Sequence, residues 1–148
     1  MTNLNFQEWK NKASKLNIRN KAFIDGKFVN SVSGKTLDSI NPATGDVLTK
    51  ISECDEQDIN SAVIAARKVF EKGKWSRMAP GDRKSVLLKL SELIRKNLEE
   101  LALLDSLDMG KLVKDAATVD VPGSAMFFQW HAGAIGFEPS TSILARFS

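Results

Sequence analysis

A chain of 148 residues with 43% apolar and 26% charged residues has the composition of an ordinary globular domain, or of part of one, and argues against disorder. The net charge of +3 is too small to indicate nucleic acid by itself, and a single Cys excludes an intrachain disulfide framework. No apolar run reaches the length of a membrane span and the first residues lack the plan of a signal peptide, so we expect a cytoplasmic protein with no membrane partner.

The first predicted element is an amphipathic helix near the N-terminus, within residues 1–20. Apolar residues recur there at helical spacing: Phe6, Trp9, Ala13 and Leu16. The lysines between them fit either a basic arm for nucleic acid or an ordinary solvated helix face. We favour the solvated face, because no aromatic stacking platform accompanies the charges, and we expect no nucleic-acid partner.

Two strand pairs follow. In residues 23–29 two short apolar runs flank Asp25-Gly26, a pair of residues that suits the positive φ angles of a type I′ hairpin turn. The second pair is predicted over residues 37–40 and 47–51, joined by a turn through Pro42 and Gly45.

Residues 55–110 predict three consecutive amphipathic helices that supply most of an apolar core. The first helix carries Ile59, Val63, Ala66 and Phe70 on one stripe, and the second carries Val86, Leu87, Leu90, Leu93 and Ile94. Leu101, Leu104 and Leu107 belong to the third.

Start and stop signals bound these helices. Asp55 and Asp58 form a capping box at the first helix, and Gly73 ends it. Pro80 suits the first turn of the second helix, because its missing N–H would have no partner there. Asn97 is predicted to cap the third helix, which ends at Gly110.

Several runs in this order and spacing resemble the N-terminal part of the NAD(P)-dependent aldehyde dehydrogenase family. They read FIDGKFV at 23–29, INPATGDV at 40–47, LDMGK at 107–111 and VPGSA at 121–125. The resemblance implies an α/β, Rossmann-type fold for the full family. For this chain alone it implies a mostly helical α+β portion with two strand pairs, in which residues 21–135 are the N-terminal part of the cofactor-binding domain.

The resemblance also implies a reaction. The family oxidises an aldehyde by attack of a cysteine thiolate, hydride transfer to NAD or NADP, and hydrolysis of the thioester with a glutamate base. The family places these groups, and the cofactor site, downstream of the matched motifs, so we assign no catalytic or cofactor-binding residue here. We expect this chain to bind neither NAD nor NADP and to be inactive alone. The run at 121–125 and Trp130 look most like the branch that acts on γ-glutamyl-aminobutyraldehyde and related amino-aldehydes.

Two residues invite a catalytic interpretation that we do not favour. Cys54 lies between Glu53 and Asp55, and neighbouring carboxylates disfavour a thiolate, so we expect a structural or surface cysteine. His131 follows Trp130 with no Cys or second His in reach, which favours packing or solvation over catalysis or metal binding.

Two weaker sites carry over from the family by position. Many members hold a monovalent cation at positions that match Ser39, Ile40 and Asp108, and oxygen ligands suit Na⁺ or K⁺. The alternative, that Asp108 satisfies backbone donors at a helix end, has equal weight. The family's substrate tunnel is lined at positions matching Val119, Gly123 and Phe127, on a helix expected over residues 118–135; simple core packing is the alternative.

Residues 136–148 depart from the family pattern, and we interpret them as an unrelated ending on a truncated family gene. Helix faces that pack on a sheet in the full enzyme would then be exposed, so we expect self-association or association with full-length dehydrogenase subunits. A small helical interaction module without enzymatic activity is the alternative class of function.

Overall fold

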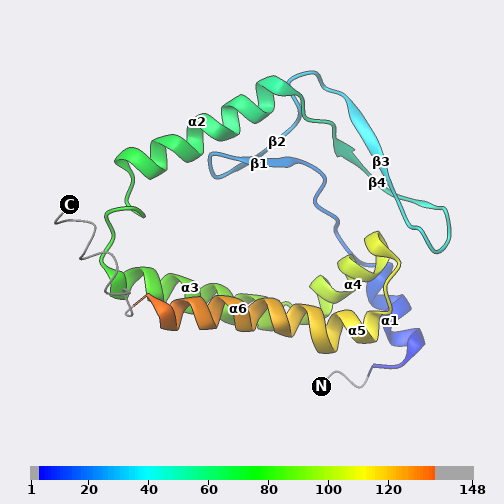
Figure 1. The fold of residues 1–148 in the computed structure, drawn as a ribbon. Coiled ribbons are helices and arrows are strands. Elements are labelled where there is room, and N and C mark those ends of the chain that lie inside the picture. Colours follow the sequence, from blue (N-terminus) through cyan, green and yellow to red (C-terminus); the bar gives the residue numbers. More distant parts are fainter. Residues whose placement is uncertain (1–3, 136–148) are drawn as a thin grey trace, which may run out of the picture.

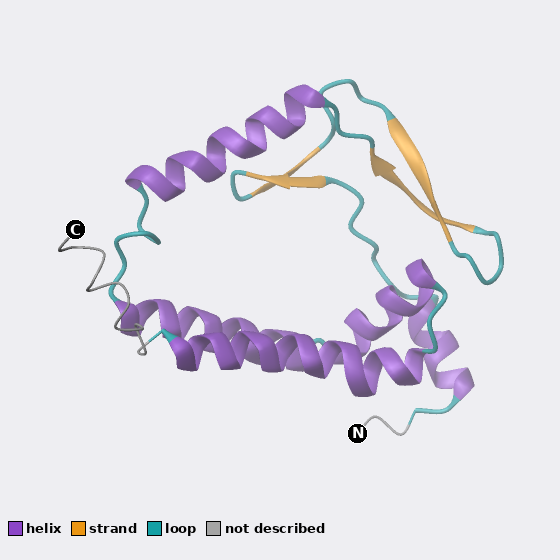
Figure 2. Cartoon of the chain, in the orientation of Figure 1, coloured by secondary structure: helices purple, strands orange, loops and turns teal. Residues whose placement is uncertain are grey.

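The computed structural model describes residues 4–135, drawn in Figure 1 and, by secondary structure, in Figure 2. The ending predicted for residues 136–148 lies outside the described residues. Helix α2 (Glu56–Lys72) and two strand pairs lie on one side of the molecule, and helix α3 (Pro80–Lys96) runs beside α6 (Val121–Ala134) on the other (Figure 1). Within residues 4–135, no helix combines the length and the apolar character that a membrane crossing requires.

Both predicted strand pairs are confirmed. Strands β1 (Ala22–Ile24) and β2 (Lys27–Val29) pair antiparallel, and the turn between them has the positive φ angles that the sequence predicts, 49° at Asp25 and 77° at Gly26. Strands β3 (Thr36–Ile40) and β4 (Val47–Ser52) form a second, separate antiparallel pair.

The N-terminal helix α1 (Phe6–Ala13) is shorter than predicted. Asn5 caps it in a box with Glu8, which the sequence analysis missed. Trp9 is buried, whereas Phe6 is 80% exposed. An ion pair of 2.9 Å between Lys12 and Glu99 links this helix to α4 (Leu98–Met109), so at least one of its lysines serves the fold.

Helix α2 (Glu56–Lys72) has the predicted ends but not the predicted burial. Asp55 accepts the Gln57 N–H at 2.9 Å, the Asp58 carboxylate accepts the Asp55 N–H at 3.0 Å, and Gly73 is the C-cap. The expected core stripe is wrong for this helix, since Ile59, Val63 and Phe70 are all more than half exposed. Its described packing partner is β1, and Ala62 and Ala65 of α2 line a hollow together with Phe23 and Ile24 of that strand.

Helix α3 (Pro80–Lys96) begins at Pro80 as predicted. Its stripe divides: Leu87 and Ile94 are half-buried, whereas Val86, Leu90 and Leu93 are exposed. The reason is that the face of α3 that contains Ser91 packs against α6. Ser91 is buried at this contact, and its Oγ donates to the Ala125 carbonyl at 2.7 Å.

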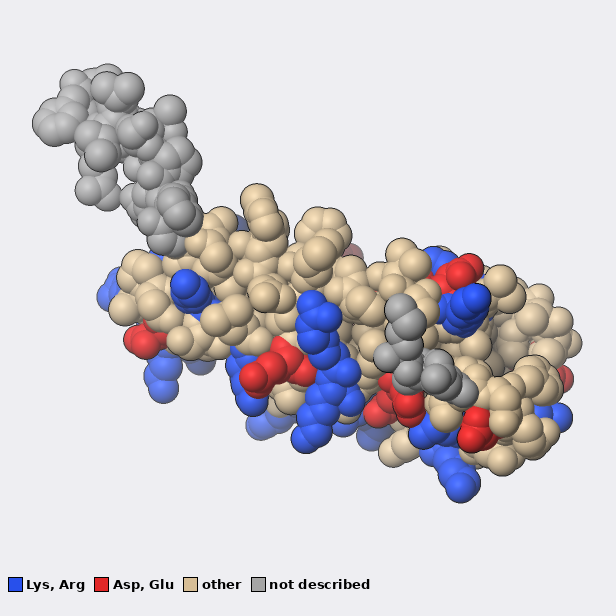
Figure 3. All heavy atoms as spheres, turned by 90° about the horizontal axis from the view of Figure 1, so that it is seen from below, with Lys and Arg blue, Asp and Glu red and all other residues tan. Residues whose placement is uncertain are grey.

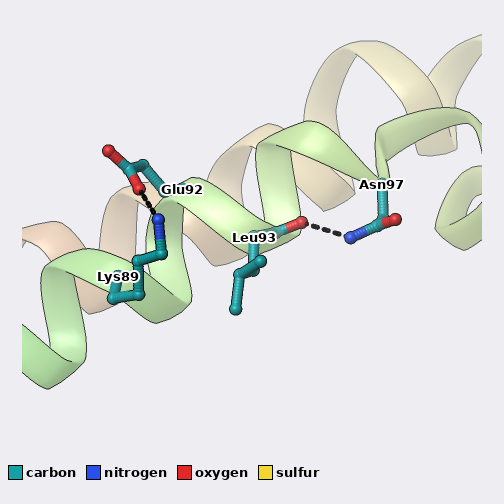
Figure 4. A network of polar contacts seen from close by, with 4 residues as sticks. All are labelled: Lys89, Glu92, Leu93 and Asn97. Atoms are coloured by element: carbon teal, nitrogen blue, oxygen red, sulfur yellow. Dashed lines mark hydrogen bonds and ion pairs between the residues drawn. The ribbon is translucent and has the colours of Figure 1, made fainter.

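Asn97 is the residue before α4, as predicted, but its side chain makes no capping hydrogen bond to the first turn of that helix. Its side-chain amide donates to the Leu93 carbonyl at 2.8 Å, so it satisfies the end of α3 rather than the start of α4 (Figure 4). Beside it, a hydrogen bond and the positive charge of Lys89 hold the pKa of the Glu92 carboxyl below its usual value (Figure 4).

The last helical stretch begins earlier than predicted. It runs through α5 (Val113–Asp115), a π-helical segment η1 (Ala116–Asp120) and α6 (Val121–Ala134). The buried core lies where this stretch meets α4 and α1, and consists of Trp9, Ala102, Leu103, Ala116, Ala117 and Val121. Most of these side chains are small, and no large side chain of the described residues is completely buried.

Candidate functional site

The turn between β3 and β4 is held by its own backbone. The Asn41 N–H donates to the Asp46 carbonyl at 2.9 Å, and the Gly45 N–H donates to the Asn41 carbonyl at 2.8 Å. The Asn41 side chain accepts the Ala43 N–H at 2.9 Å, which closes an Asx turn around Pro42. The position of Pro42 is therefore fixed locally.

Pro42 packs against the end of α4 at Gly110. This glycine has a φ of 71°, and a Cβ placed on it would lie 2.9 Å from Pro42 Cγ. Two constraints, the left-handed backbone and the close approach, require glycine here. The contact brings the end of β3 beside the last turn of α4.

Two of the predicted cation-binding residues meet at this contact. The Ser39 hydroxyl donates to Asp108 Oδ1 at 3.0 Å, and the β3–β4 ladder is irregular between Ser39 and Ile40. Ile40 follows directly, with an exposed side chain, so its carbonyl is the group it can offer. Among the described residues, Ser39 is the sole hydrogen-bond donor to the Asp108 carboxylate. The alternative, in which this carboxylate accepts backbone N–H groups at the end of the helix, is therefore not supported by a hydrogen bond. The available oxygens fit a hard monovalent cation.

An ion pair that the sequence analysis missed lies next to this contact. Lys111, in the LDMGK run, pairs with Asp120 at the end of η1. The hydrogen bond to Asp120 raises the pKa of Lys111 above its usual value, so the pair persists throughout the neutral range. The two partners are nine residues apart and lie in different segments, so the i,i+3 and i,i+4 spacings of a single helix do not predict this pair.

The three predicted tunnel residues lie on one face of η1 and α6, since they are spaced four residues apart. Val119 is 62% exposed and Phe127 65% exposed, while a Cβ at Gly123 would meet no atom within 4 Å. Ala125 and Ala132, on the other side, are completely buried. The face is therefore open in the described part of the chain, and the Phe127 side chain does not lie in the core of that part.

The π-helical segment next to this face has a cause in the sequence. The Val121 N–H donates to the Ala116 carbonyl five residues back, and Pro122 has no N–H with which to continue the α-helical ladder. Pro122 was the signal that could have predicted this irregularity. Such segments occur often at functional sites, and this one contains Val119.

Cys54 has the properties of a surface thiol. It is exposed, and desolvation, with the negative charges of Asp58 and Asp55, raises the pKa of its thiol. A raised pKa leaves less thiolate at neutral pH, which is the direction the sequence predicts and opposes nucleophilic attack.

His131 is exposed on α6, with its ring centroid 5.0 Å from that of Trp130. In the part of the chain that the structure describes, no group of three or more His, Cys, Asp or Glu side chains is placed to hold a metal ion. The interpretation as a solvated residue beside an aromatic ring fits this position.

With this geometry in view, comparisons with known proteins identify the class. The sequence profile of the aldehyde dehydrogenase family matches residues 28–143, so the chain belongs to that family. It is 40% identical over 132 residues to aminoacetaldehyde dehydrogenase of Pseudomonas aeruginosa, a match that covers 89% of this chain and 27% of that protein. It is also 42% identical to the NADP/NAD-dependent aldehyde dehydrogenase PuuC of Escherichia coli, over 86% of this chain and 26% of that protein.

Solved structures agree with the sequence matches. The γ-glutamyl-γ-aminobutyraldehyde dehydrogenase of Burkholderia cenocepacia superposes with a TM-score of 0.88 at 45% identity, over 89% of this chain and 27% of that one. The indole-3-acetaldehyde dehydrogenase AldA of Pseudomonas syringae, in a complex with NAD⁺, superposes with a TM-score of 0.86 at 42% identity, over 88% and 26%. The predicted family and its N-terminal position are confirmed, and the chain spans about a quarter of the length of these relatives.

Proposed function

We propose that this chain forms the N-terminal, outer helical part of an enzyme that oxidises an aldehyde to a carboxylic acid with NAD or NADP. The match that carries this proposal is the superposition on the Burkholderia cenocepacia enzyme, which extends over 89% of the chain. An amino-aldehyde is the favoured substrate class, because two similar proteins, aminoacetaldehyde dehydrogenase and γ-glutamyl-γ-aminobutyraldehyde dehydrogenase, are named for substrates of that class.

In this proposal the chain alone binds no NAD and is inactive. Its single cysteine is a thiol with a raised pKa, and no G-x-G-x-x-G run occurs in the sequence. Without an activated nucleophile and a cofactor, nothing in the chain lowers the barrier to hydride transfer.

The test is NADH or NADPH formation by the purified chain on aminoacetaldehyde, γ-aminobutyraldehyde and indole-3-acetaldehyde, beside a thermal melt with each cofactor. We expect no turnover and no shift in Tm, with the Pseudomonas aeruginosa relative as the active control. Turnover that survives Cys54→Ser would show that the chain has a complete site of another kind. Turnover abolished by this substitution would make Cys54 the nucleophile, and either result would overturn the proposal.

We also propose that Ser39, Ile40 and Asp108 hold a monovalent cation. The bond between Ser39 and Asp108 supports this, because it holds the carboxylate beside the strand end where backbone oxygens are available. The Tm of the chain should rise in KCl or NaCl relative to choline chloride at equal ionic strength, and Asp108→Asn should abolish the difference. An equal Tm in all three salts would contradict the site.

A second candidate function is a helical interaction module. The observation that favours it is the number of large apolar side chains exposed on α2, α3 and α6. Self-association and association with full-length dehydrogenase subunits are the interactions expected of such a surface.

A further inference from the structure

A groove opens between the end of α1, the turn from α3 to α4, and the region where η1 meets α6. Its volume is about 910 Å³, within the range of roughly 300–1,000 Å³ that is typical of binding sites for small molecules. The residues assigned to the cation contact do not line this groove, and neither do the three residues of the open face on η1 and α6. The groove is therefore a separate feature of the surface.

The floor of the groove is apolar and continuous with the buried core. Leu103 and Ala117 belong to that core, at 5% and 6% exposed, and Leu16 and Leu98 pack against it. Pro122 completes the apolar part of the lining. Among the described residues, no aromatic side chain lines the groove, so it has no ring on which a nucleobase could stack. The floor therefore favours an aliphatic group.

The rim of the groove has more unpaired cations than unpaired carboxylates. Lys15, Arg95 and Lys96 are exposed there, and no ion pair among the described residues involves them. Glu100 is the carboxylate of the rim that is left without such a pair. Figure 3 shows charges of both signs mixed over the underside of the molecule, so the excess of positive charge is local to the groove. Cations around a concave apolar surface focus their field into it, and the groove therefore attracts anions.

The two walls of the groove are linked directly. Lys12 of α1 pairs with Glu99 in the first turn of α4 at 2.9 Å, and the Lys15 N–H donates to the Lys12 carbonyl at 3.0 Å. No side chain caps the first turn of α4, because the Asn97 amide is used at the end of α3. The positive end of the α4 dipole therefore adds to the field of the cations.

We infer that this groove binds an amphiphilic anion, which is an aliphatic chain that ends in a carboxylate or a phosphate group. The chain lies on the apolar floor, and the head group meets Lys15, Arg95 and Lys96. Arginine matches such a head group with two parallel N–H donors, and lysine adds a point charge. A neutral chain would leave the cations unpaired, and a small anion would leave the floor in water, so both parts of the ligand contribute to binding. This binding goes beyond aldehyde oxidation and does not depend on it.

The experiment titrates the purified 148-residue chain with sodium octanoate at neutral pH and follows the amides by ¹H–¹⁵N NMR. We expect saturable shifts at the amides of Lys15, Leu98 and Thr118, which all line the groove. The Kd for octanoate should be at least about tenfold lower than for 1-octanol, which lacks the charge, and than for acetate, which lacks the chain.

A variant without the three rim cations tests the head-group contact. Lys15→Gln, Arg95→Gln and Lys96→Gln together should raise the Kd for octanoate at least about tenfold. These side chains are exposed, so the substitutions leave the chain folded.

A matched control removes the same charge elsewhere. Lys68→Gln, Lys72→Gln and Lys74→Gln lie on α2 and just after it, outside the groove, and should change the Kd by less than about twofold because their field is screened. Glu100→Gln removes the unpaired carboxylate of the rim and should lower the Kd by about twofold.

Other results would overturn the inference. Shifts confined to the exposed apolar side chains of α2 and α6 would show that octanoate only coats those surfaces. An equal Kd for octanoate and 1-octanol, or an unchanged Kd in the variant without the rim cations, would show that these cations do not bind the head group. Sedimentation with vesicles of phosphatidylcholine and phosphatidylglycerol, lost in that variant and without binding of octanoate, would assign the cations to a membrane surface instead.

Discussion

At the scale of single residues, the most constrained group is the carboxylate of Asp58. It is 3% exposed and accepts the N–H groups of Asp55, at 3.0 Å, and of Val32, at 3.1 Å. It therefore completes the start of α2 and ties the helix to the loop between β2 and β3. The capping role is readable from the sequence, whereas the bond to Val32, 26 residues away, is not.

We predict that Asp58→Ala destabilises the chain by about 1–2 kcal/mol, since it removes half of the capping box of α2 and the acceptor of the Val32 N–H. Urea unfolding followed by circular dichroism measures this. Asp55→Asn is the matched control, because asparagine also caps helices well, and it should cost only a few tenths of a kcal/mol. A loss below about 0.5 kcal/mol for Asp58→Ala would show that the Val32 bond contributes little.

The thiol of Cys54 provides a prediction about pH. Its pKa is raised in part by the charge of Asp55, so removing this charge lowers the pKa and increases the thiolate fraction at pH 8. Asp55→Asn should accelerate alkylation by iodoacetamide about twofold, a modest factor because the charges are screened by solvent. Glu71→Gln, at the far end of α2, should leave the rate unchanged. An unchanged rate in Asp55→Asn would show that the Asp55 charge does not contribute to the raised pKa, which would then be due to desolvation and Asp58.

At the scale of elements, the contact between the β3–β4 turn and the end of α4 depends on one backbone position. We predict that Gly110→Ala costs about 1–2 kcal/mol, because alanine is strained at a φ of 71° and its Cβ would meet Pro42. Gly123→Ala is the opposite case, a helical glycine with open space around it, and should stabilise the chain by up to about 1 kcal/mol.

Thermal or urea unfolding of the two variants distinguishes these effects. Adding Pro42→Ala to Gly110→Ala should recover the part of the loss that is due to the close contact and leave the part that is due to φ. If Gly110→Ala were as stable as the unmodified chain, the docking of the turn on α4 would be wrong.

At the scale of the whole molecule, stability is unevenly distributed. The α3–α6 pair and the neighbouring core of α4 and η1 contain the buried alanines, whereas α2 is anchored by its N-terminal cap and by one short hairpin. We predict that hydrogen exchange in the isolated chain is fastest in α2 and slowest in α6, because few buried contacts oppose the opening of α2. Exchange measured by mass spectrometry checks this, and equal protection of both helices would contradict the uneven packing.

Local features of the chain were readable because they depend on neighbouring residues. The Asp25-Gly26 hairpin turn, the Asp55–Asp58 capping box, Pro80 at a helix start and Gly110 at a helix end each follow from the backbone preferences of a few residues. The order and spacing of these features, with the motifs between them, were enough to place the chain in its family, which the profile match over residues 28–143 confirms.

The tertiary structure alone decided which apolar stripes are buried. Periodicity identifies a helix face but not what covers it, so the stripes of α2 and α3 were predicted as core when Val63, Phe70 and Leu90 are exposed. The meeting of Ser39 with Asp108, 69 residues apart, was expected only through the family. The pairing of Lys111 with Asp120 was not expected at all. The physical reason is the same in each case: local backbone preferences act over a few residues, whereas burial and side-chain pairing depend on groups brought together from distant parts of the sequence.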